Sequence, residues 1–425
     1  MSPKRWLAVF IVLSLLLLIL LPACGGGNGK ETSTPTSLPS LTPTTIATAV
    51  PTLTPTATAM STLTPTLAGP VKVGAIAPWS GTMGVASVLT DQIIALVEEQ
   101  VKNMGGILGG REIKFVRGDD RGILAESVAQ AKKLVLEDKV TILTLGGINT
   151  AGFTAVANIA EELKVPFISF AQISGVAAMK YSACQMWHGA SIDEIARFII
   201  DVLKPKTVAW LANEAEDAHQ MVDGVEDIVG IRDQLKAAGI DIVYEEYFLP
   251  GTMDLSPYLT KIKYLSPDVL ATYFNDTGYA VTINKQITEL GGWGSIKYYG
   301  ATPSASAKAA IKMPSAVGTY TNVYWLPGSD EPGMKAFEDA FRQKYGYLPD
   351  PNLSFFYNCF WTAIKAIELA GTDDHDKVAQ ALRSGNLEWD SAWGPLRINT
   401  DGRGEITSMI VQVQEGGEMV KVWPQ

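Results

Sequence analysis

Residues 71–120, VKVGAIAPWSGTMGVASVLTDQIIALVEEQVKNMGGILGGREIKFVRGDD, decide the fold of this chain. The segment opens with a β-rich run at Val71–Ala77, and apolar residues then recur with helical spacing from Leu89 to Met104. Paired glycines end that predicted helix and turn the chain into a second predicted strand, Glu112–Gly118. A strand–helix–strand unit of this kind predicts two parallel strands, with a functional loop at the carboxyl end of the first strand.

The loop after the first predicted strand is a candidate ligand-binding loop. Trp79 and Ser80 lie just before the predicted helix, where free backbone N–H groups and the helix dipole favour an anionic group. An ordinary strand-to-helix connection has the same pattern, so this unit alone leaves both interpretations open.

The composition restricts the class of protein. A length of 425 residues allows two domains, and a net charge of −10 argues against a broad nucleic-acid-binding surface. The three Cys and three His show no HxxxH or CxxC spacing, so we expect no metal site and no cofactor. Cys184 and Cys359 could pair in an oxidising compartment or could be two buried free thiols.

The first 70 residues are predicted to lie outside the folded part. Lys4 and Arg5 precede a continuous apolar run at Leu7–Leu21, which is typical of a signal segment covering residues 1–24. The LPAC sequence that ends it resembles a bacterial lipobox, in which Cys24 is lipidated and becomes the new N-terminus. An uncleaved anchor is the alternative, although the apolar run is short for a membrane span. Residues 25–70 are rich in Thr and Pro and predict an extended tether.

From Val71 onward, predicted strands and helices alternate, which indicates an α/β fold. The predicted strands cover residues 71–77, 112–118, 140–145, 165–170, 207–211, 241–247, 268–274 and 296–299. Further helices are predicted at 193–203, around 223–238, and at 255–264, 279–290, 334–345 and 353–369. Two consecutive arrays of similar size predict two doubly wound, Rossmann-like lobes.

Several blocks resemble, in order, the type I periplasmic binding proteins of the branched-chain amino acid or amide subfamily, which serve ABC importers. These blocks are the 80–120 part of the opening segment, DKVTILTLGGINTAGFTAVANIAEELKVPFISFA at 138–171, SPDVLATYFNDTGYAVTINKQITELG at 266–291, and FEDAFRQKYGYLPDPNLSFFYNCFWTAIKAIELAG at 337–371. The resemblance covers about residues 71–415.

The resemblance implies two lobes joined by a three-strand hinge, with crossovers near residues 187–191, 320–326 and 393–396. Lobe one would hold residues 71–190 and 326–392, and lobe two residues 191–325 and 393–425.

A small ligand would bind between the lobes of a monomer and be delivered to an ABC permease, outside the cytoplasm. The alternative is a sensor of the same fold that acts on a membrane signalling partner. An enzyme is disfavoured, because neither a GxSxG elbow nor a GxGxxG loop follows a predicted strand.

The resemblance also implies where the ligand binds. Its carboxylate would meet three loops of lobe one, and its amino group would meet an acid of lobe two. That acid aligns with Thr302 here, so either the ligand lacks an amine or another carboxylate takes the role, for which Asp276 is the candidate; an Asx turn or a helix cap is the alternative role of Asp276. The predicted ligand is a small carboxylate-bearing or amide compound, with an amino acid, branched-chain or related, favoured if Asp276 lines the cleft. Ser80 and Thr150 could equally cap the helices that they precede. The predicted ligand-binding residues are Trp79, Ser80, Asn149, Thr150, Ala171, Ile173, Asp276 and Thr302.

The lipobox interpretation predicts the effect of replacing the acylated cysteine. Cys24→Ala should leave the protein without lipid and still carrying residues 1–24, because the thiol is the acylation site. Mass spectrometry of the mature protein measures both. An unmodified N-terminus downstream of Cys24 in the wild-type protein would contradict the lipoprotein interpretation.

Overall fold

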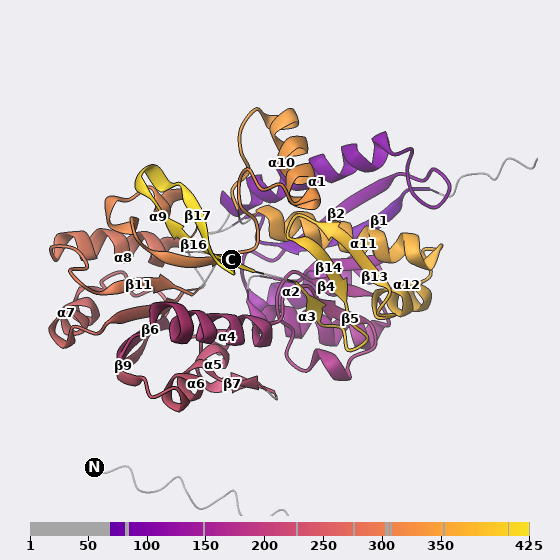
Figure 1. Cartoon of the computed structure of the whole chain (residues 1–425). Helices are drawn as coiled ribbons and strands as arrows, with labels where there is room; N and C mark the ends of the chain where they lie inside the picture. The colour runs from indigo at the N-terminus through magenta and orange to yellow at the C-terminus, as the bar shows by residue number, and fades with distance from the viewer. Residues whose placement is uncertain are drawn as a thin grey trace, which may run out of the picture. The chain divides into compact units, whose positions relative to one another are not determined.

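The computed structural model describes residues 69–80, 85–147, 149–226, 228–274, 277–301, 306, 308–351, 353–406 and 408–424 (Figure 1). The chain divides into two compact units, Met1–Thr64 and Pro65–Gln425, and every described residue belongs to the second. Cys24 and nearly all of the predicted tether therefore lie outside the described residues. None of the described helices is both long enough and apolar enough to cross a membrane.

Five parallel strands form the first sheet, in the order β2-β1-β3-β4-β5. Its strands are β1 (Val71–Ala77), β2 (Ile113–Asp119), β3 (Ile142–Leu145), β4 (Phe167–Ser169) and β5 (Ser182–Cys184). The connecting helices are α1 (Val85–Asn103), α2 (Leu124–Leu136) and α3 (Thr150–Leu163), with the 3-10 turn η1 (Val176–Ala178) before β5. The predicted parallel pairing of the first two strands is confirmed, with Val71 opposite Ile113.

Strand β1 is buried on both faces, because it lies between β2 and β3. Val71, Val73 and Ala75 belong to a core cluster that also contains residues of α1 and of the later helix α11 (Leu353–Ala370). Ile76 belongs to a different cluster, which contains residues of α2 and α3. The alternating directions of strand side chains explain why β1 reads as an almost continuous apolar run.

The second sheet has seven strands in the order β17-β16-β12-β11-β10-β6-β9. The parallel strands are β6 (Thr207–Asn213), β9 (Asp241–Phe248), β10 (Val269–Tyr273), β11 (Lys297–Gly300) and β12 (Tyr320–Val323). Strands β16 (Met409–Val413) and β17 (Met419–Trp423) are antiparallel additions at one edge. The described part of the chain therefore has the two sheets of a doubly wound α/β fold.

Helices cover both faces of the second sheet. They are α4 (His188–Arg197), continued by the π-helix η2 (Phe198–Leu203), and α5 (Glu216–Asp223), α6 (Ile231–Ala237), α7 (Ser256–Leu265), α8 (Thr277–Glu289) and α9 (Lys308–Ile311). Val208 and Trp210 of β6 share a core cluster with α4, α5 and α6, whereas Leu211 shares a cluster with α7 and α8. The short turns η4 (Pro314–Ala316) and η5 (Glu415–Gly417) precede β12 and β17.

The chain returns to the first sheet after β12. Helices α10 (Pro332–Tyr345), α11 (Leu353–Ala370) and α12 (His375–Leu382) are followed by a small antiparallel sheet of β13 (Leu387–Ser391), β14 (Gly394–Ile398) and β15 (Gly404–Glu405). Figure 1 shows these orange and yellow elements beside the indigo β1 and α1. Trp393 and Leu396 lie in the core cluster of the first sheet, and the chain joins the second sheet again only at β16.

The structure corrects the helix predicted around 223–238. This segment contains a two-stranded hairpin, β7 (Gly224–Val225) and β8 (Ile228–Val229), and then the shorter helix α6; an unpredicted helix, α5, precedes the hairpin. Gly224 has a φ of +102°, and a Cβ there would lie 2.3 Å from the Ile228 carbonyl oxygen. Glycine therefore ends α5 and allows the two hairpin strands to approach.

Removing a fully buried ring from α11 should destabilise the whole unit. Phe360 is 0% exposed, and its ring centroid lies 4.6 Å from that of Phe115 in β2. Phe360→Ala should lower the free energy of unfolding in urea by about 3–5 kcal/mol, through lost burial and the cavity left behind. Leu369→Ala is the matched control, because Leu369 is 48% exposed on the same helix. It should change stability by no more than about 0.5 kcal/mol. Equal effects of the two substitutions would contradict the packing of α11 on the first sheet.

Candidate functional site

Trp79 and Ser80, in the first strand-to-helix loop, are held by carboxylates of neighbouring elements. The Trp79 indole N–H donates to Asp91 Oδ1 at 2.9 Å, and the Trp79 ring is partly buried against the core of the first sheet. The Ser80 hydroxyl donates to Asp119 Oδ2 at 2.5 Å, and the Ser80 backbone N–H donates to Asp119 Oδ1 at 3.1 Å. Because Asp119 ends β2, the ends of two adjacent strands position this loop.

The hydrogen bonds at Asp119 favour its charged form. Partial burial raises the pKa of the Asp119 carboxyl, but donated bonds from Ser80 and from the Arg121 backbone outweigh it. The pKa therefore lies below the ordinary value of 3.8. Because the pKa in the folded state is depressed, the stabilisation is present above the ordinary pKa of aspartate. It is lost as the pH falls through the folded-state pKa.

Asn149 and Thr150 lie at the beginning of α3. The Asn149 side-chain oxygen accepts the backbone N–H of Gly152 at 2.9 Å, which makes Asn149 the N-cap residue. Thr150 is the first helical residue and is buried. The sequence allowed Thr150 either to cap α3 or to bind the ligand. The structure gives the capping role to Asn149. The loop presents an ordered helix N-terminus at the carboxyl edge of β3.

A glycine brings this loop close to the next strand. Gly146 has a φ of +91°, and a Cβ at this position would lie 2.4 Å from Cζ of Phe167 in β4. Both the backbone conformation and the close ring contact therefore require glycine at this position.

The loop after β4 contains the predicted contacts Ala171 and Ile173. The Ala171 backbone N–H donates to the Ser169 hydroxyl at 3.2 Å, and the Ile173 side chain is 0% exposed in the core beside α2 and α3. The Ser174 backbone N–H donates to the Thr154 hydroxyl at 3.0 Å. The loop is thus rigidly attached to the first sheet, and Ile173 contributes to its core.

Polar side chains of the same loop connect the first sheet to helix α5 of the second. The Gln172 amide donates to Gln220 Oε1 at 2.9 Å, and the Ser174 hydroxyl donates to Glu216 Oε1 at 2.8 Å. The Gln220 amide also donates to Glu216 Oε1 at 3.1 Å. We refer to Gln172, Ser174, Glu216 and Gln220 as the interlobe polar cluster.

The same helix carries a buried carboxylate. Asp217 is only 9% exposed, and its Oδ2 accepts a hydrogen bond of 3.4 Å from the hydroxyl of Tyr273, the last residue of β10. Because β10 pairs with β6 in parallel, Asp217 and Tyr273 both lie at the carboxyl edge of the second sheet.

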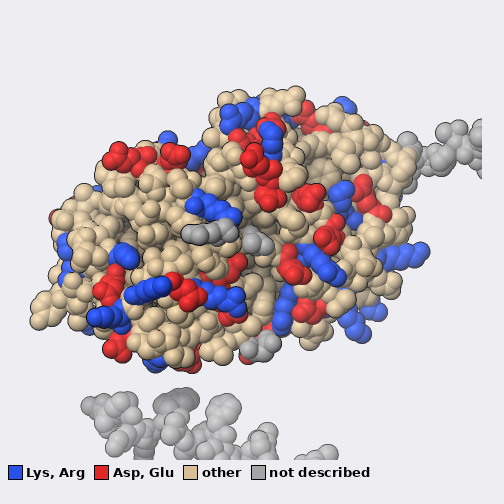
Figure 2. Space-filling view, viewed as in Figure 1, with Lys and Arg blue, Asp and Glu red and all other residues tan. Residues whose placement is uncertain are grey.

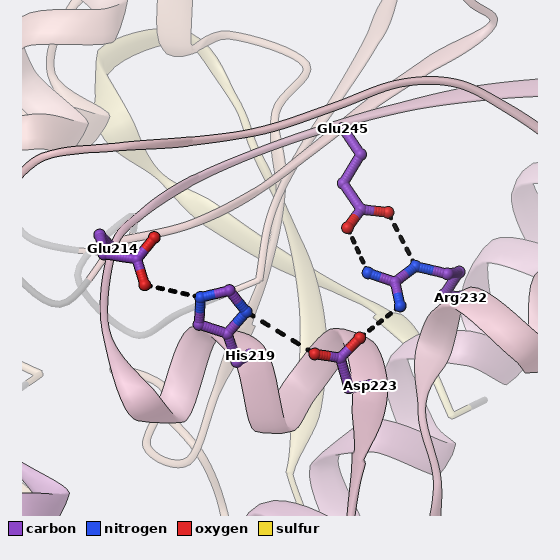
Figure 3. A network of polar contacts seen from close by, with 5 residues as sticks. All are labelled: Glu214, His219, Asp223, Arg232 and Glu245. Carbon is purple, nitrogen blue, oxygen red and sulfur yellow. Dashed lines mark hydrogen bonds and ion pairs between the residues drawn. The ribbon is translucent and has the colours of Figure 1, made fainter. Parts of the chain in front are cut away.

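Helix α5 also carries a charged network (Figure 3). His219 Nε2 lies 2.7 Å from Glu214 Oε1, and its Nδ1 lies 3.6 Å from Asp223 Oδ2. Arg232 pairs with Asp223 and also with Glu245, to which its Nε donates at 2.8 Å. These contacts attach α5 to α6 and β9 of the second sheet.

Two hydrogen bonds connect the segments that pass between the sheets. The Ser191 and Tyr324 hydroxyls, near the start of α4 and after β12, lie 3.0 Å apart. The Ser408 hydroxyl, just before β16, donates to Glu194 of α4. Burial raises the pKa of the Glu194 carboxyl, and the bond from Ser408 opposes that shift. All three connecting segments are thus joined to one another through α4.

A further ion pair joins the small β7–β8 hairpin to the loop before β15. The Arg403 guanidinium pairs with Glu226 and lies over the Trp187 ring, 4.2 Å from its centroid. The segment from α5 to the hairpin therefore contacts, at two places, elements attached to the first sheet.

Asp276 and Thr302, the two lobe-two residues that the sequence predicted, lie outside the described residues. Cys184 and Cys359 are both buried free thiols.

The sequence analysis did not assign a site role to Gln172, Glu216 or Gln220. The only available signal was their position after the predicted strands at 165–170 and 207–211.

The comparisons with known proteins agree with this architecture. The periplasmic binding protein family matches residues 70–418. A Leu/Ile/Val-binding protein homolog 7 of Brucella abortus is 22% identical over 373 residues, covering 83% of this chain and 91% of that protein. The chain belongs to the periplasmic binding protein family, which confirms the predicted resemblance. It is therefore a binding protein rather than an enzyme.

Solved structures show the same fold. The substrate-binding protein LivJ of Streptococcus pneumoniae, in complex with isoleucine, aligns with a TM-score of 0.70 and 20% identity, covering 83% of this chain and 100% of that one. A solute-binding protein of R. palustris in complex with benzoate aligns with a TM-score of 0.71 and 20% identity, covering 83% and 96%. At these identities the likeness establishes the type I fold and not the ligand.

The contact between Ser80 and Asp119 can be tested by titration. Ser80→Ala should raise the pKa of the Asp119 carboxyl toward 3.8, because a bond to the charged form is lost. Carboxyl NMR resonances followed between pH 2 and 6 measure it, with Asp254 as an internal reference, since its lowered pKa depends on Ser256 instead. An unchanged Asp119 titration would contradict the hydrogen bond.

Proposed function

We propose that this protein captures a small carboxylate-bearing ligand between two lobes, outside the cytoplasmic membrane, and delivers it to an ABC importer. The observation that carries this proposal is the family match over residues 70–418 together with the polar contacts between the carboxyl edges of the two sheets. An amino acid is the favoured ligand class. The relative named as a Leu/Ile/Val-binding protein homolog and the isoleucine complex of LivJ support this class.

The lobe boundaries belong to the same proposal. Lobe one is built on the first sheet and lobe two on the second. The first two crossovers stay near residues 187–191 and 320–326. We place the third between β15 and β16, and not at 393–396, because Trp393 and Leu396 pack in the core of the first sheet. Lobe two then takes only residues after 408 from the C-terminal part.

The carboxylate of the ligand is assigned to lobe one. The N-terminus of α3, capped by Asn149, offers a positive partial charge, and the loop with Ser80 lies at the end of the neighbouring strand β1. Ser80 and Asn149 are held by hydrogen bonds within their own lobe, so these two residues would lose little conformational freedom when a ligand binds. Cys24 supplies the proposed lipid anchor and residues 25–70 the tether.

Ligand binding and lobe closure should be observable together. Amino acids, benzoate and 4-hydroxybenzoate are screened by thermal shift, in which a ligand at 100 times its Kd should stabilise the fold by about 2.7 kcal/mol. Small-angle scattering with the best ligand should then give a smaller radius of gyration, because closure brings the lobes together. A panel without any stabilising compound, or an unchanged scattering curve with a bound ligand, would refute the proposal.

A substitution in the interlobe polar cluster can be tested with the same binding and scattering measurements. Gln220→Ala removes the hydrogen bond from Gln172 that joins the two lobes, which contributes about 0.5–1.5 kcal/mol; the bond from Gln220 to Glu216 lies within α5. The substitution should therefore weaken ligand binding roughly 2- to 13-fold and shift the scattering toward the open form. Gln380→Ala, an exposed substitution on α12, is the control and should leave both measurements unchanged.

A further inference from the structure

A second contact joins the two lobes besides the interlobe polar cluster. The Arg403 guanidinium, in the loop before β15, pairs with the Glu226 carboxylate at the turn of the β7–β8 hairpin, and the two side chains are only 18% and 29% exposed. Figure 2 shows acidic and basic side chains interspersed over the face viewed, so an ion pair by itself distinguishes nothing. This pair differs in what its two ends are attached to.

The lobe-one end of the pair is fixed to the first sheet. The Cys184 backbone N–H, at the end of β5, donates to the Gly402 carbonyl oxygen at 2.9 Å, and Cys184 also forms a parallel β-bridge with Arg403. A Cβ at Gly404 would lie 2.0 Å from the Gln185 carbonyl oxygen. The loop therefore lies too close to the first sheet to move independently of it.

The lobe-two end of the pair is fixed by the hairpin. Val225, the residue before Glu226, is buried in the core cluster that contains α4, α5 and α6. Glu226 has a φ of +55°, in the left-handed region where glycine or asparagine is usual. The backbone at this turn therefore gives no reason for a glutamate, whereas the contact of its carboxylate with Arg403 does.

The same guanidinium contacts the first crossover. It lies over the Trp187 ring, 4.2 Å from the ring centroid, and Trp187 is the N-cap residue of α4. A Cβ at Gly189 would lie 2.2 Å from Cη2 of Trp187, so the ring lies directly on the backbone at the start of α4. A rotation of lobe two about the crossovers would therefore displace both the Trp187 ring and the Glu226 carboxylate relative to Arg403.

We propose that Arg403, Glu226 and Trp187 form a latch that holds the lobes in the described arrangement, so that the ion pair sets how readily the lobes separate without ligand. Because both ends of the pair are rigid, no local loop movement compensates for its loss. Salt screens a pair that is partly exposed, so the latch makes lobe separation depend on ionic strength. This inference rests on the lobe movement of the proposed function and adds a control of that movement.

Small-angle scattering of the full-length, ligand-free protein tests the latch. Raising NaCl from about 0.05 M to about 0.5 M should increase the radius of gyration of the wild-type protein. Glu226→Gln should increase it at both salt concentrations, by shifting the population toward separated lobes about 3- to 10-fold, and should remove the salt dependence. Asp339→Asn is the matched control, because it breaks the exposed Lys335–Asp339 pair within α10 and should reproduce the wild-type curves.

A second variant separates the latch from the stability of the hairpin. Glycine adopts the φ of position 226 without strain, so Glu226→Gly should not lower the urea midpoint of unfolding, yet it should separate the lobes as Glu226→Gln does. In protein labelled with fluorotryptophan, the fluorine resonance of Trp187, assigned with Trp187→Phe, should shift in both variants. A shifted resonance with an unchanged radius of gyration would show a merely local contact and overturn the proposal.

The remaining outcomes separate this inference from the proposed function. A ligand that reduces the radius of gyration of the wild-type protein, together with an unchanged radius in ligand-free Glu226→Gln, would refute the latch alone. Lobes that respond to salt and to Glu226→Gln, in a protein that binds no compound of the panel, would support the latch and refute the proposed ligand capture. A wild-type radius of gyration that responds neither to salt nor to any ligand would refute both.

Discussion

The double burial of β1 is the constraint on which the rest of the structure depends. A parallel strand between two others has no solvent-facing side, so both faces of the first sheet need an apolar cover. Helices α2 and α3 cover one face, but α1 alone does not complete the other. The cover is completed by α10 to α12, which follow the second sheet in the chain. The chain must therefore leave the first sheet, build the second and return, which creates the connections between them.

Those connections place the carboxyl edges of two sheets against each other. Parallel strands all end at the same edge, and the loops that follow them carry the polar groups of the site. The loop after β4 reaches α5 through Gln172 and Ser174, while Ser191 and Tyr324 join two of the crossovers. Hydrogen bonds of about 1 kcal/mol each can be broken and remade when lobes move, whereas the apolar cores within each lobe cannot. The division between rigid lobes and a polar boundary suits a protein that closes on a ligand.

Helix α5 illustrates how one short element can serve several purposes. Its side toward lobe one carries Glu216 and Gln220, and its buried side carries Asp217. It also carries His219 and Asp223, whose contacts with Glu214 and Arg232 hold the helix to its own lobe (Figure 3). A displacement of α5 would therefore change the interlobe contacts and these contacts within its own lobe together.

The sequence by itself determined the alternation of strands and helices and the two sheets, because long apolar segments such as 71–77 and 353–369 depend little on their surroundings. It indicated the family through the blocks that resemble it, such as residues 138–171. It located the loops with Ser80 and Asn149 for the same reason, since both follow clear strands. Only the tertiary structure decided that Asn149 caps α3, and that β13–β15 pack on the first sheet. It also revealed α5, an eight-residue helix too short to show a reliable apolar period. The pairing of Asp217 with Tyr273 joins residues 56 positions apart. Such a contact depends on which strands become neighbours in the sheet, and no local pattern contains that information.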